Sequence, residues 1–300
     1  MVESIKLQNV ESGEMLALDM VSTPDFILGS VDWGAVESSR YTYKYVNQVG
    51  VYVSGTSLET RPITITGWVI ADSEDEMTAR KSILNRFFNP QQAIDLFYQE
   101  YVLRFLPDTS IRYSVNVAEN NEVVCKFKVS GICPDPLFAE RLESKVTAAS
   151  TVGMFHFPLI MSKVPKPPGG IVFGVRQPSL LVTITNRGAV PVGMKIVFKA
   201  KGALLNPSLI DINTQKYFKI NKEMQAGETI EINTVIGEKE IKGISNGVSR
   251  NYFKYRDLDS SWLQLAVGDN LFRYNADANI DNLEAYIYYN NKYLEVQGCC

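Results

Sequence analysis

Few side chains in this sequence stand out as candidates for catalysis. His156 is the only histidine of the 300 residues, and it lies between Phe155 and Phe157 in a strand-like pattern. A serine or cysteine triad would need this imidazole as its base, and no G-x-S-x-G motif accompanies it. The 33 aspartates and glutamates offer many carboxylate pairs for glycoside cleavage, but no pair stands out by position. We therefore interpret His156 as an interfacial or half-buried strand residue, and we predict no catalytic residue and no enzymatic activity.

Metal and cofactor motifs are also missing from the sequence. Residues 257–261 begin like a calcium loop, but the sixth position is Trp262 instead of glycine and the twelfth is Gly268 instead of glutamate. The stretch 243–247 lacks the lysine and the serine or threonine of a phosphate-binding loop. No C-x-x-C pair occurs among the four cysteines, which are Cys125, Cys133, Cys299 and Cys300. We expect a turn at 257–261, a core position for Cys125, and no metal, cofactor or structural disulfide.

The charge balance and the hydropathy pattern exclude two classes of partner. The formal net charge is −3, from 30 basic and 33 acidic residues, whereas nucleic-acid-binding proteins concentrate basic charge. No run approaches the roughly 20 apolar residues that a membrane helix needs. The start of the chain lacks the basic and apolar segments of a secretory signal. We expect no specific nucleic acid, no membrane insertion, and production in the cytoplasm with release by a route such as cell lysis.

One segment alternates tyrosines with polar residues and is a candidate binding surface. Residues 40–45 read RYTYKY, which places Tyr41, Tyr43 and Tyr45 on one face of a strand. Basic and aromatic residues mixed in this way also form platforms for single-stranded nucleic acid. The acidic net charge favours the other interpretation, an exposed hairpin. Tyrosine offers a large contact area at low entropic cost, so such a hairpin would suit a protein–protein interface.

The first half of the sequence predicts strands around one helix. Residues 61–70 (RPITITGWVI) alternate apolar and polar side chains, with Ile63 and Ile65 on one face. Residues 110–117 and 123–129 alternate in the same way around an Asn-rich turn and predict a hairpin. After the strand at 61–70 and before this hairpin, residues 73–88 carry an apolar stripe at helical spacing that follows a capping box formed by Ser73 and Glu76.

The second half predicts strands without a further helix. A proline-rich close at 134–136 and a polar stretch at 139–150 mark a boundary near residue 145. We therefore expect one domain at 1–145, with the helix 73–88, and a second at 146–300. Short strands at steady spacing, separated by Gly, Asn, Asp and Pro, predict an antiparallel sandwich or barrel in the second domain.

The order of these motifs resembles one known family. In the first half the resemblance rests on residues 61–67 (RPITITG), 85–90 (NRFFNP) and 129–138 (VSGICPDPLF). In the second half it rests on residues 184–188 (ITNRG), 206–209 (NPSL), 224–232 (MQAGETIEI), 259–262 (DSSW) and 265–274 (LAVGDNLFRY). Across both halves the chain resembles the distal tail proteins of long-tailed bacteriophages with non-contractile tails.

This resemblance implies a fold, an assembly and partners. The fold would be mainly β, with an N-terminal split β-barrel similar to tail-tube subunits, one flanking helix, and a C-terminal galectin-like antiparallel β-sandwich. Six copies would form a ring in the virion that joins the tail tube to the tip or baseplate hub and the receptor-binding proteins. Residues 41–53 would be the hairpin that packs on a neighbouring subunit, with Tyr41, Tyr43 and Tyr45 as contact residues. Assembly would take place in the host cytoplasm.

The alternative interpretation is a carbohydrate-binding module that recognises the host cell surface. Trp262 is the aromatic residue that could stack on a sugar ring, although core packing is the more common role of a tryptophan. We do not carry sugar binding over from the galectin-like label, because the only histidine cannot be assumed to lie in such a site.

Overall fold

The computed structural model describes residues 4–21, 25–47, 49–116, 118–121, 123–149, 151–153, 174–176 and 181–296. His156, Cys299 and Cys300 lie outside these residues, as do the expectations made for them. The chain divides into two compact units. Residues 1–142 and the segment from 292 onward form the first unit, and residues 143–291 form the second. Within the described ranges, no helix is both long and apolar enough to cross a membrane.

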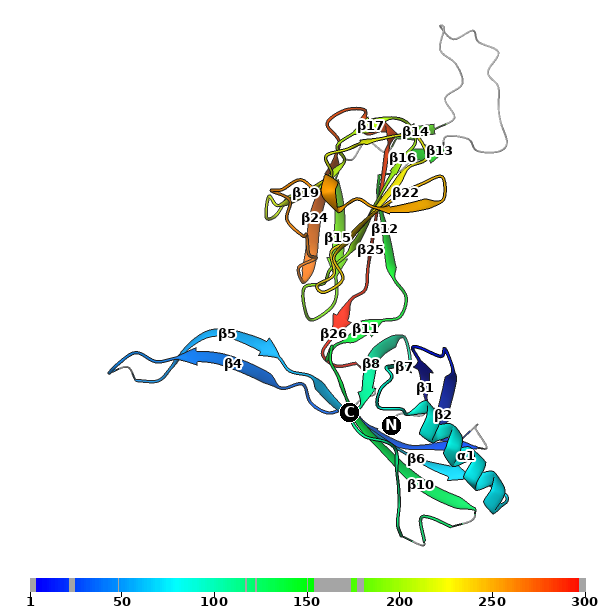
Figure 1. Cartoon of the computed structure of the whole chain (residues 1–300). Coiled ribbons are helices and arrows are strands. Elements are labelled where there is room, and N and C mark those ends of the chain that lie inside the picture. The colour runs from blue at the N-terminus through cyan, green and yellow to red at the C-terminus, as the bar shows by residue number, and fades with distance from the viewer. Residues whose placement is uncertain are drawn as a thin grey trace, which may run out of the picture. The chain divides into compact units, whose positions relative to one another are not determined.

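Seven strands of the first unit close into a barrel (Figure 1). Their order is β8-β7-β1-β2-β3-β6-β10, and a short pairing of Gly131 with Pro107 and of Ile132 with Leu106 joins β10 back to β8. Only β2 and β3 run parallel, through a single residue pair. The strands span β1 Ser4–Asn9, β2 Met15–Asp19, β3 Phe26–Asp32, β6 Arg61–Ile70, β7 Ile94–Tyr98, β8 Tyr101–Pro107 and β10 Val124–Cys133. The predicted N-terminal barrel is confirmed.

The alternating pattern of β6 places its apolar side chains inside the barrel. Ile63, Ile65 and Val69 are buried, as the alternation predicts. Gly67 belongs to the same inward series, and a Cβ atom there would lie 2.5 Å from the ring of Phe127. Glycine at this position therefore lets an aromatic ring cover the strand.

Cys125 and Cys133 lie on the inner face of β10, and both are free and buried. Burial raises the pKa of the Cys133 thiol to about 12, against the opposing charge of Arg61. The thiol is therefore protonated near neutral pH, and a role in packing accounts for it.

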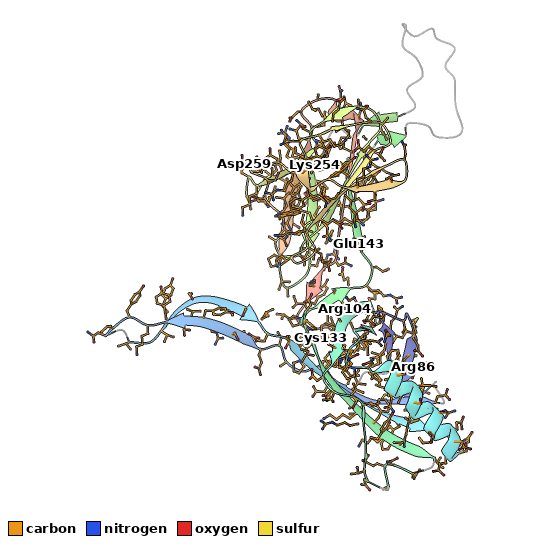
Figure 2. The ribbon with its side chains drawn as sticks, viewed as in Figure 1. Arg86, Arg104, Cys133, Glu143, Lys254 and Asp259 are labelled. Carbon is orange, nitrogen blue, oxygen red and sulfur yellow. The ribbon has the colours of Figure 1, made fainter. Side chains whose placement is uncertain are left out.

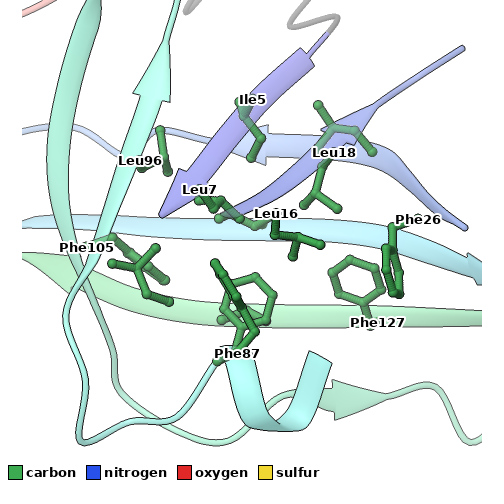
Figure 3. Close-up of a cluster of buried hydrophobic side chains, with 14 of the residues drawn as sticks. Ile5, Leu7, Leu16, Leu18, Phe26, Phe87, Leu96, Phe105 and Phe127 are labelled. Atoms are coloured by element: carbon green, nitrogen blue, oxygen red, sulfur yellow. The ribbon is translucent and has the colours of Figure 1, made fainter. Parts of the chain in front are cut away.

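Helix α1 (Glu74–Phe87) covers the barrel core through the predicted stripe. Met77, Leu84 and Phe87 are buried, and Figure 3 shows Phe87 among side chains of the barrel strands. The Ser73 hydroxyl accepts a hydrogen bond from the Glu76 amide at 3.3 Å, as expected of the N-cap. The Glu76 carboxylate, however, accepts from the amide of Asp72 at 2.8 Å, one residue before the amide that a capping box predicts.

The hairpin predicted at 110–129 is shorter than its pattern suggests. Strand β9 comprises only Arg112–Tyr113, which pair with Lys128 and Phe127 of β10. Beyond it, the Asn120 side chain donates to the carbonyl of Ser114 at 2.8 Å, and Val115 is 97% exposed. Asparagine side chains compete with the strand ladder for backbone groups, so part of the alternating segment belongs to the turn.

The second unit contains two antiparallel sheets that enclose a second core. The larger has the order β12-β25-β16-β21-β22-β23, and the smaller has the order β15-β24-β18-β19. The strands of the larger sheet are β12 Ser144–Ala149, β16 Lys195–Ala200, β21 Thr229–Asn233, β22 Glu240–Ser245, β23 Val248–Asn251 and β25 Leu283–Tyr289. Those of the smaller sheet are β15 Leu181–Asn186, β18 Ser208–Asp211, β19 Tyr217–Lys219 and β24 Gly268–Asn275. The predicted C-terminal sandwich is confirmed.

Short elements complete the second unit. Two further pairs of strands are β13 Thr151–Gly153 with β14 Gly174–Arg176, and β17 Leu204–Leu205 with β20 Glu223–Met224. Single turns of 3-10 helix occur at η1 Phe253–Tyr255 and η2 Ile280–Asn282. As the sequence predicts, no α-helix is present among the described residues after 150.

The last described strand belongs to the first unit. Strand β26 (Lys292–Tyr293) pairs with β11 (Phe138–Glu140), which in turn pairs with β8 of the barrel. The Tyr293 hydroxyl donates to the Glu140 carboxylate at 2.8 Å. The first unit is therefore completed by residues that follow the whole second unit in sequence.

Candidate assembly surface

A two-stranded hairpin connects β3 to β6 and extends from the barrel (Figure 1). Strand β4 (Ser38–Tyr43) pairs antiparallel with β5 (Tyr52–Leu58), and neither pairs with another strand in the described parts of the chain. We call residues 38–58 the arm. Figure 2 shows its side chains standing away from the dense packing of the barrel.

The predicted tyrosines lie on the outer half of the arm and are exposed. The exposed fractions of Tyr41, Tyr43 and Tyr45 are 62%, 40% and 66%. The ring of Tyr43 lies 5.2 Å from that of Tyr45 and 4.8 Å from that of Tyr52. The structure therefore groups Tyr43 and Tyr45 but not Tyr41, whose ring lies beside Gly55 across the hairpin. Tyr52 was missed in the sequence, although it is the cross-strand partner of Tyr43.

Valines extend this aromatic surface around the arm tip. The four are well exposed: Val46 at 91%, Val49 at 100%, Val51 at 58% and Val53 at 46%. Apolar residues concentrated in this way on a monomer typically mark a contact with another molecule. A two-stranded hairpin without a covering layer is also only marginally stable in water. The arm thus presents an exposed aromatic and apolar surface that no other described strand covers.

The arm is held at its root by a fully buried arginine. Arg61 is 0% exposed and is the first residue of β6, three positions after the arm ends. Its guanidinium donates to the carboxylate of Glu295 at 3.3 Å and lies 4.8 Å from the centre of the Phe138 ring. It also donates to four backbone carbonyls, those of Trp33, Gly34, Pro136 and Leu294. One side chain therefore ties together both ends of the arm, the segment before β11 and the returning end of the chain.

Gly34 fixes the direction in which the chain enters the arm. Its φ is +55°, and a Cβ atom here would lie 2.2 Å from the carbonyl oxygen of Pro62. Its amide donates to the carboxylate of Asp32 at 3.0 Å. Beside it, the ring of Trp33 lies 5.1 Å from that of Tyr98. The arm root is therefore packed against the first unit, whereas the tyrosines and valines of the outer arm are exposed.

Trp262 lies in the second unit and is half-buried against its core. Its ring is 5.1 Å from the buried Phe218 and 6.0 Å from Phe253. Two cations also lie beside it, Lys239 at 5.4 Å and Arg256 at 5.7 Å from the ring. Much of the Trp262 ring is therefore in contact with residues of its own unit, and no contact among the described residues favours sugar binding at Trp262.

The acidic segment before Trp262 forms a turn. The Ser260 amide donates to the carbonyl of Asp257 at 3.1 Å, and the Asp257 carboxylate accepts from Asn221 at 2.9 Å and from Tyr217 at 3.2 Å. These bonds, led by that of Asn221, lower the pKa of Asp257 although desolvation opposes them. Within the described residues, no three His, Cys, Asp or Glu side chains are grouped to hold a metal ion.

Two models of phage tail proteins match the chain, one in each half. Residues 24–129 match the phage tail protein RIFT-related domain, and residues 187–293 match the C-terminal domain of the siphovirus-type tail component. The chain belongs to the siphovirus-type distal tail proteins. No curated protein sequence matches it.

Solved structures with the same fold cover nearly the whole of this distal tail protein. The crystal structure of the Dit protein of phage SPP1, described as a paradigm of the hub adsorption apparatus in phages that infect Gram-positive bacteria, has a TM-score of 0.66 at 12% identity. It covers 97% of this chain and 99% of its own. A chain of the phage P2 baseplate, in its conformation activated with Ca, has a TM-score of 0.55 at 11% identity. The match covers 99% of this chain and 100% of the other. A chain of the P2 baseplate activated with Sr has a TM-score of 0.54 at 12% identity, and the match covers 99% of this chain and 100% of the other.

These matches place the protein among virion components. The matched families and similar structures are structural proteins of phage tails and baseplates, and they are not enzymes. This distal tail protein is accordingly a structural component of the tail or baseplate.

Proposed function

We propose that six copies of this distal tail protein form a ring at the end of the tail tube. On one side the ring contacts the tail-tube protein. On the other it holds the tip or baseplate hub and, through a galectin-like second unit, the receptor-binding proteins. The ring assembles in the host cytoplasm and occupies the tail tip of the finished virion.

The exposed arm is the observation that carries this proposal. A closed ring of identical subunits needs a heterologous interface, in which each subunit presents two different complementary patches. The arm, with Tyr43, Tyr45 and Tyr52 at its outer end, supplies one patch. The other patch is a surface of the first unit of the next subunit. The rigid root at Arg61 would reduce the entropy lost when the arm docks.

Replacing the arm tests the ring directly. In one variant, residues 41–53 are replaced by a short Gly-Ser turn, so that the root at Gly34 and Arg61 is kept. We expect six-fold particles of the unmodified protein in electron microscopy and mass photometry, with tail-tube or hub protein added where needed. The arm variant should remain monomeric, since it loses the apolar contact area of the tip.

A control variant separates loss of the arm from a general change in surface hydrophobicity. Val248→Ser alters another exposed hairpin residue, 53% exposed, in the second unit. It should assemble normally, and both variants should keep the near-ultraviolet circular dichroism of the unmodified protein. Rings formed equally well without the arm would contradict the assignment of the arm. Absence of any ring in the presence of both partner proteins would contradict the proposed function itself.

A further inference from the structure

The outer face of the larger sheet in the second unit carries a row of two lysines with a tyrosine between them. Lys145 on β12 and Lys195 on β16 are both register partners of Tyr288 on β25. The ammonium of Lys195 lies 5.2 Å from the Tyr288 ring centre, and that of Lys145 lies 5.6 Å from the same ring. Lys145 is also 4.6 Å from the ring of Tyr286, two residues along β25. Two cations are thus held on an aromatic floor.

These side chains line a groove of about 340 Å³. Val197 forms part of its floor, and Lys199, Thr229 and Glu231 line it further along the face. The volume lies at the lower end of the range for small-molecule sites, which is roughly 300–1,000 Å³. The groove is therefore suited to a ligand of one or two sugar rings and is small for a folded protein segment.

The charge in the groove is positive although the whole chain is acidic, at −3. Neighbouring lysines on this face are paired, Lys242 with Glu240 at 2.6 Å and Lys201 with Glu284 at 2.7 Å. Among the described residues, Lys145, Lys195 and Lys199 make no comparable ion pair, and Glu231 is the single acidic residue that lines the groove with them. Three cations against one anion leave an excess that attracts a negatively charged ligand.

The position of the ammonium groups also determines which kind of sugar would fit. An uncharged sugar that stacks on an aromatic ring would have to displace the lysines from Tyr286 and Tyr288. An anionic group would instead accept charge-assisted hydrogen bonds from the same ammoniums and leave their contacts with the rings in place. Thr229 adds a hydroxyl that can bond to sugar hydroxyls.

We propose that this groove binds an anionic sugar, with the negative charge supplied by a phosphate or a carboxylate group. Lys145 and Lys195 bind the anionic group from either side of Tyr288, and Lys199 and Thr229 contact the rest of the ligand. The site would give the second unit a recognition role of its own. It does not depend on ring assembly, because every residue named belongs to one subunit.

The test uses the full chain and four defined probes. Maltose is the uncharged reference, phosphorylated maltose and digalacturonate supply the two anionic groups, and a tetraglutamate peptide supplies charge without a sugar. Binding is measured by saturation-transfer difference NMR and by calorimetry at low and high salt. We expect at least one anionic sugar to bind about tenfold or more tightly than maltose, and less tightly at high salt. The stronger of the two identifies the anionic group.

Matched variants assign the binding to the groove. Lys145→Gln with Lys195→Gln should weaken anionic-sugar binding by about tenfold or more, because two charge-assisted bonds are lost. The variant with Lys145→Arg and Lys195→Arg keeps both positive charges and should retain most of the anionic-sugar binding. Lys216→Gln with Lys254→Gln removes the same charge from two exposed lysines outside the groove and should change binding by less than about twofold.

Three outcomes would overturn the proposal. The first is equal binding of maltose and both anionic sugars. The second is unchanged binding by the Lys145→Gln, Lys195→Gln variant. The third is tetraglutamate binding as tightly as the anionic sugars, which would make the face a docking surface for an acidic protein segment. Because all of these variants keep the arm unchanged, failure here leaves the result of the arm experiment unaffected.

Discussion

Two buried charged residues show how single side chains stabilise each unit. Arg61 is completely buried in the first unit, and Glu228 is 4% exposed in the second. An unpaired charge in either position would be costly, since burial removes its hydration. Both are satisfied, Arg61 mainly by backbone carbonyls and Glu228 by Lys222, Tyr252 and the amide of Gln225.

Arg61→Met should destabilise the first unit by roughly 3–5 kcal/mol. Methionine matches much of the volume but donates no hydrogen bond, so four carbonyls and the Glu295 carboxylate lose a partner. Urea denaturation measures the change in free energy of unfolding. Arg86→Met is the control, because the Arg86 side chain is 70% exposed and its ion pair with Glu14 should contribute less than about 1 kcal/mol. Equal effects of the two substitutions would contradict a structural role for Arg61.

Glu228 should make the stability of the second unit depend on pH. Burial opposes its ionisation, but hydrogen bonds from Lys222, Gln225 and Tyr252 outweigh burial and hold the pKa of Glu228 below its usual 4.5. A group whose pKa is lower in the folded state stabilises the fold above its unfolded pKa. That contribution is lost as the pH falls through the folded pKa.

Glu228→Gln should therefore cost about 2 kcal/mol at neutral pH, because charge-assisted bonds are weakened. The difference from the unmodified protein should shrink as the pH falls below about 4.5. Thermal unfolding from neutral to acidic pH measures this difference in stability. The control is Glu223→Gln, because the Glu223 side chain is exposed. A difference that stays constant down to acidic pH would show that Glu228 does not contribute through its charge.

At the scale of elements, local signals and distant contacts act together. Helix α1 begins where its sequence predicts, because the N-cap and the acidic first turn are local features. The arm is different, since its two strands pair only with each other and its direction depends on Gly34, Arg61 and their contacts.

Ser73→Ala should destabilise the first unit by about 1 kcal/mol. The substitution removes the acceptor for the Glu76 amide and leaves that donor at the helix start without its cap. Ser73→Asp should be close to neutral, because an aspartate can accept the same bond and its charge suits the helix dipole. Helical circular dichroism with urea denaturation checks both variants, and an equal loss for Ala and Asp would argue against the cap.

Gly34→Ala should lower the free energy of unfolding of the first unit by roughly 2 kcal/mol or more. Alanine is strained at a φ of +55°, and its Cβ would clash with the backbone of Pro62. Gly50→Ala, also at positive φ but with open space around it, is the matched control at the arm tip. Gly34→Ala should increase the rate of limited proteolysis in the arm and lower the temperature of thermal unfolding much more than Gly50→Ala does. Similar behaviour of both variants would mean that only the backbone angle matters.

At the scale of the whole molecule, the first unit is made from two parts of the chain that are far apart in sequence. Strand β26 and the residues after it return to the barrel after the entire second unit. Val296 is buried in the barrel core, and Leu294 and Glu295 bind Arg61. The first unit is therefore complete only when residues 292–296 are present.

Ending the chain after Asn291 should lower the stability of the first unit by roughly 3 kcal/mol. The truncation removes the partner of β11, the buried Val296 and two acceptors of Arg61. Ending the chain after Val296 is the reference for shortening alone, since it keeps all of these groups. Denaturant unfolding with fluorescence from Trp33 and Trp68 measures the change. If the two truncations behave alike, the returning segment does not stabilise the barrel.

Much of this architecture was predictable because it rests on short-range patterns. Alternation placed Ile63 and Ile65 inside, the stripe of α1 faced the core, and Tyr43 and Tyr45 met on a hairpin. Side-chain direction repeats every two residues in a strand and every 3.6 in a helix, so local sequence determines which face is apolar. The family followed from a different signal, the resemblance of motifs in both halves to known tail proteins, and family models match the same two halves.

Only the tertiary structure revealed the contacts that join distant residues. Arg61 reads in the sequence as the polar start of a strand, yet its partners lie up to 234 positions away. The groove beside Tyr288 takes its lysines from two strands, one on either side of β25, and strand β26, which pairs with β11 of the first unit, follows the whole second unit. Such contacts depend on strand order and register, which many sequences with the same alternation could satisfy differently. The sequence by itself thus determined most of the elements and their buried faces, and the fold decided which distant residues became the arm root, the groove and the completed first unit.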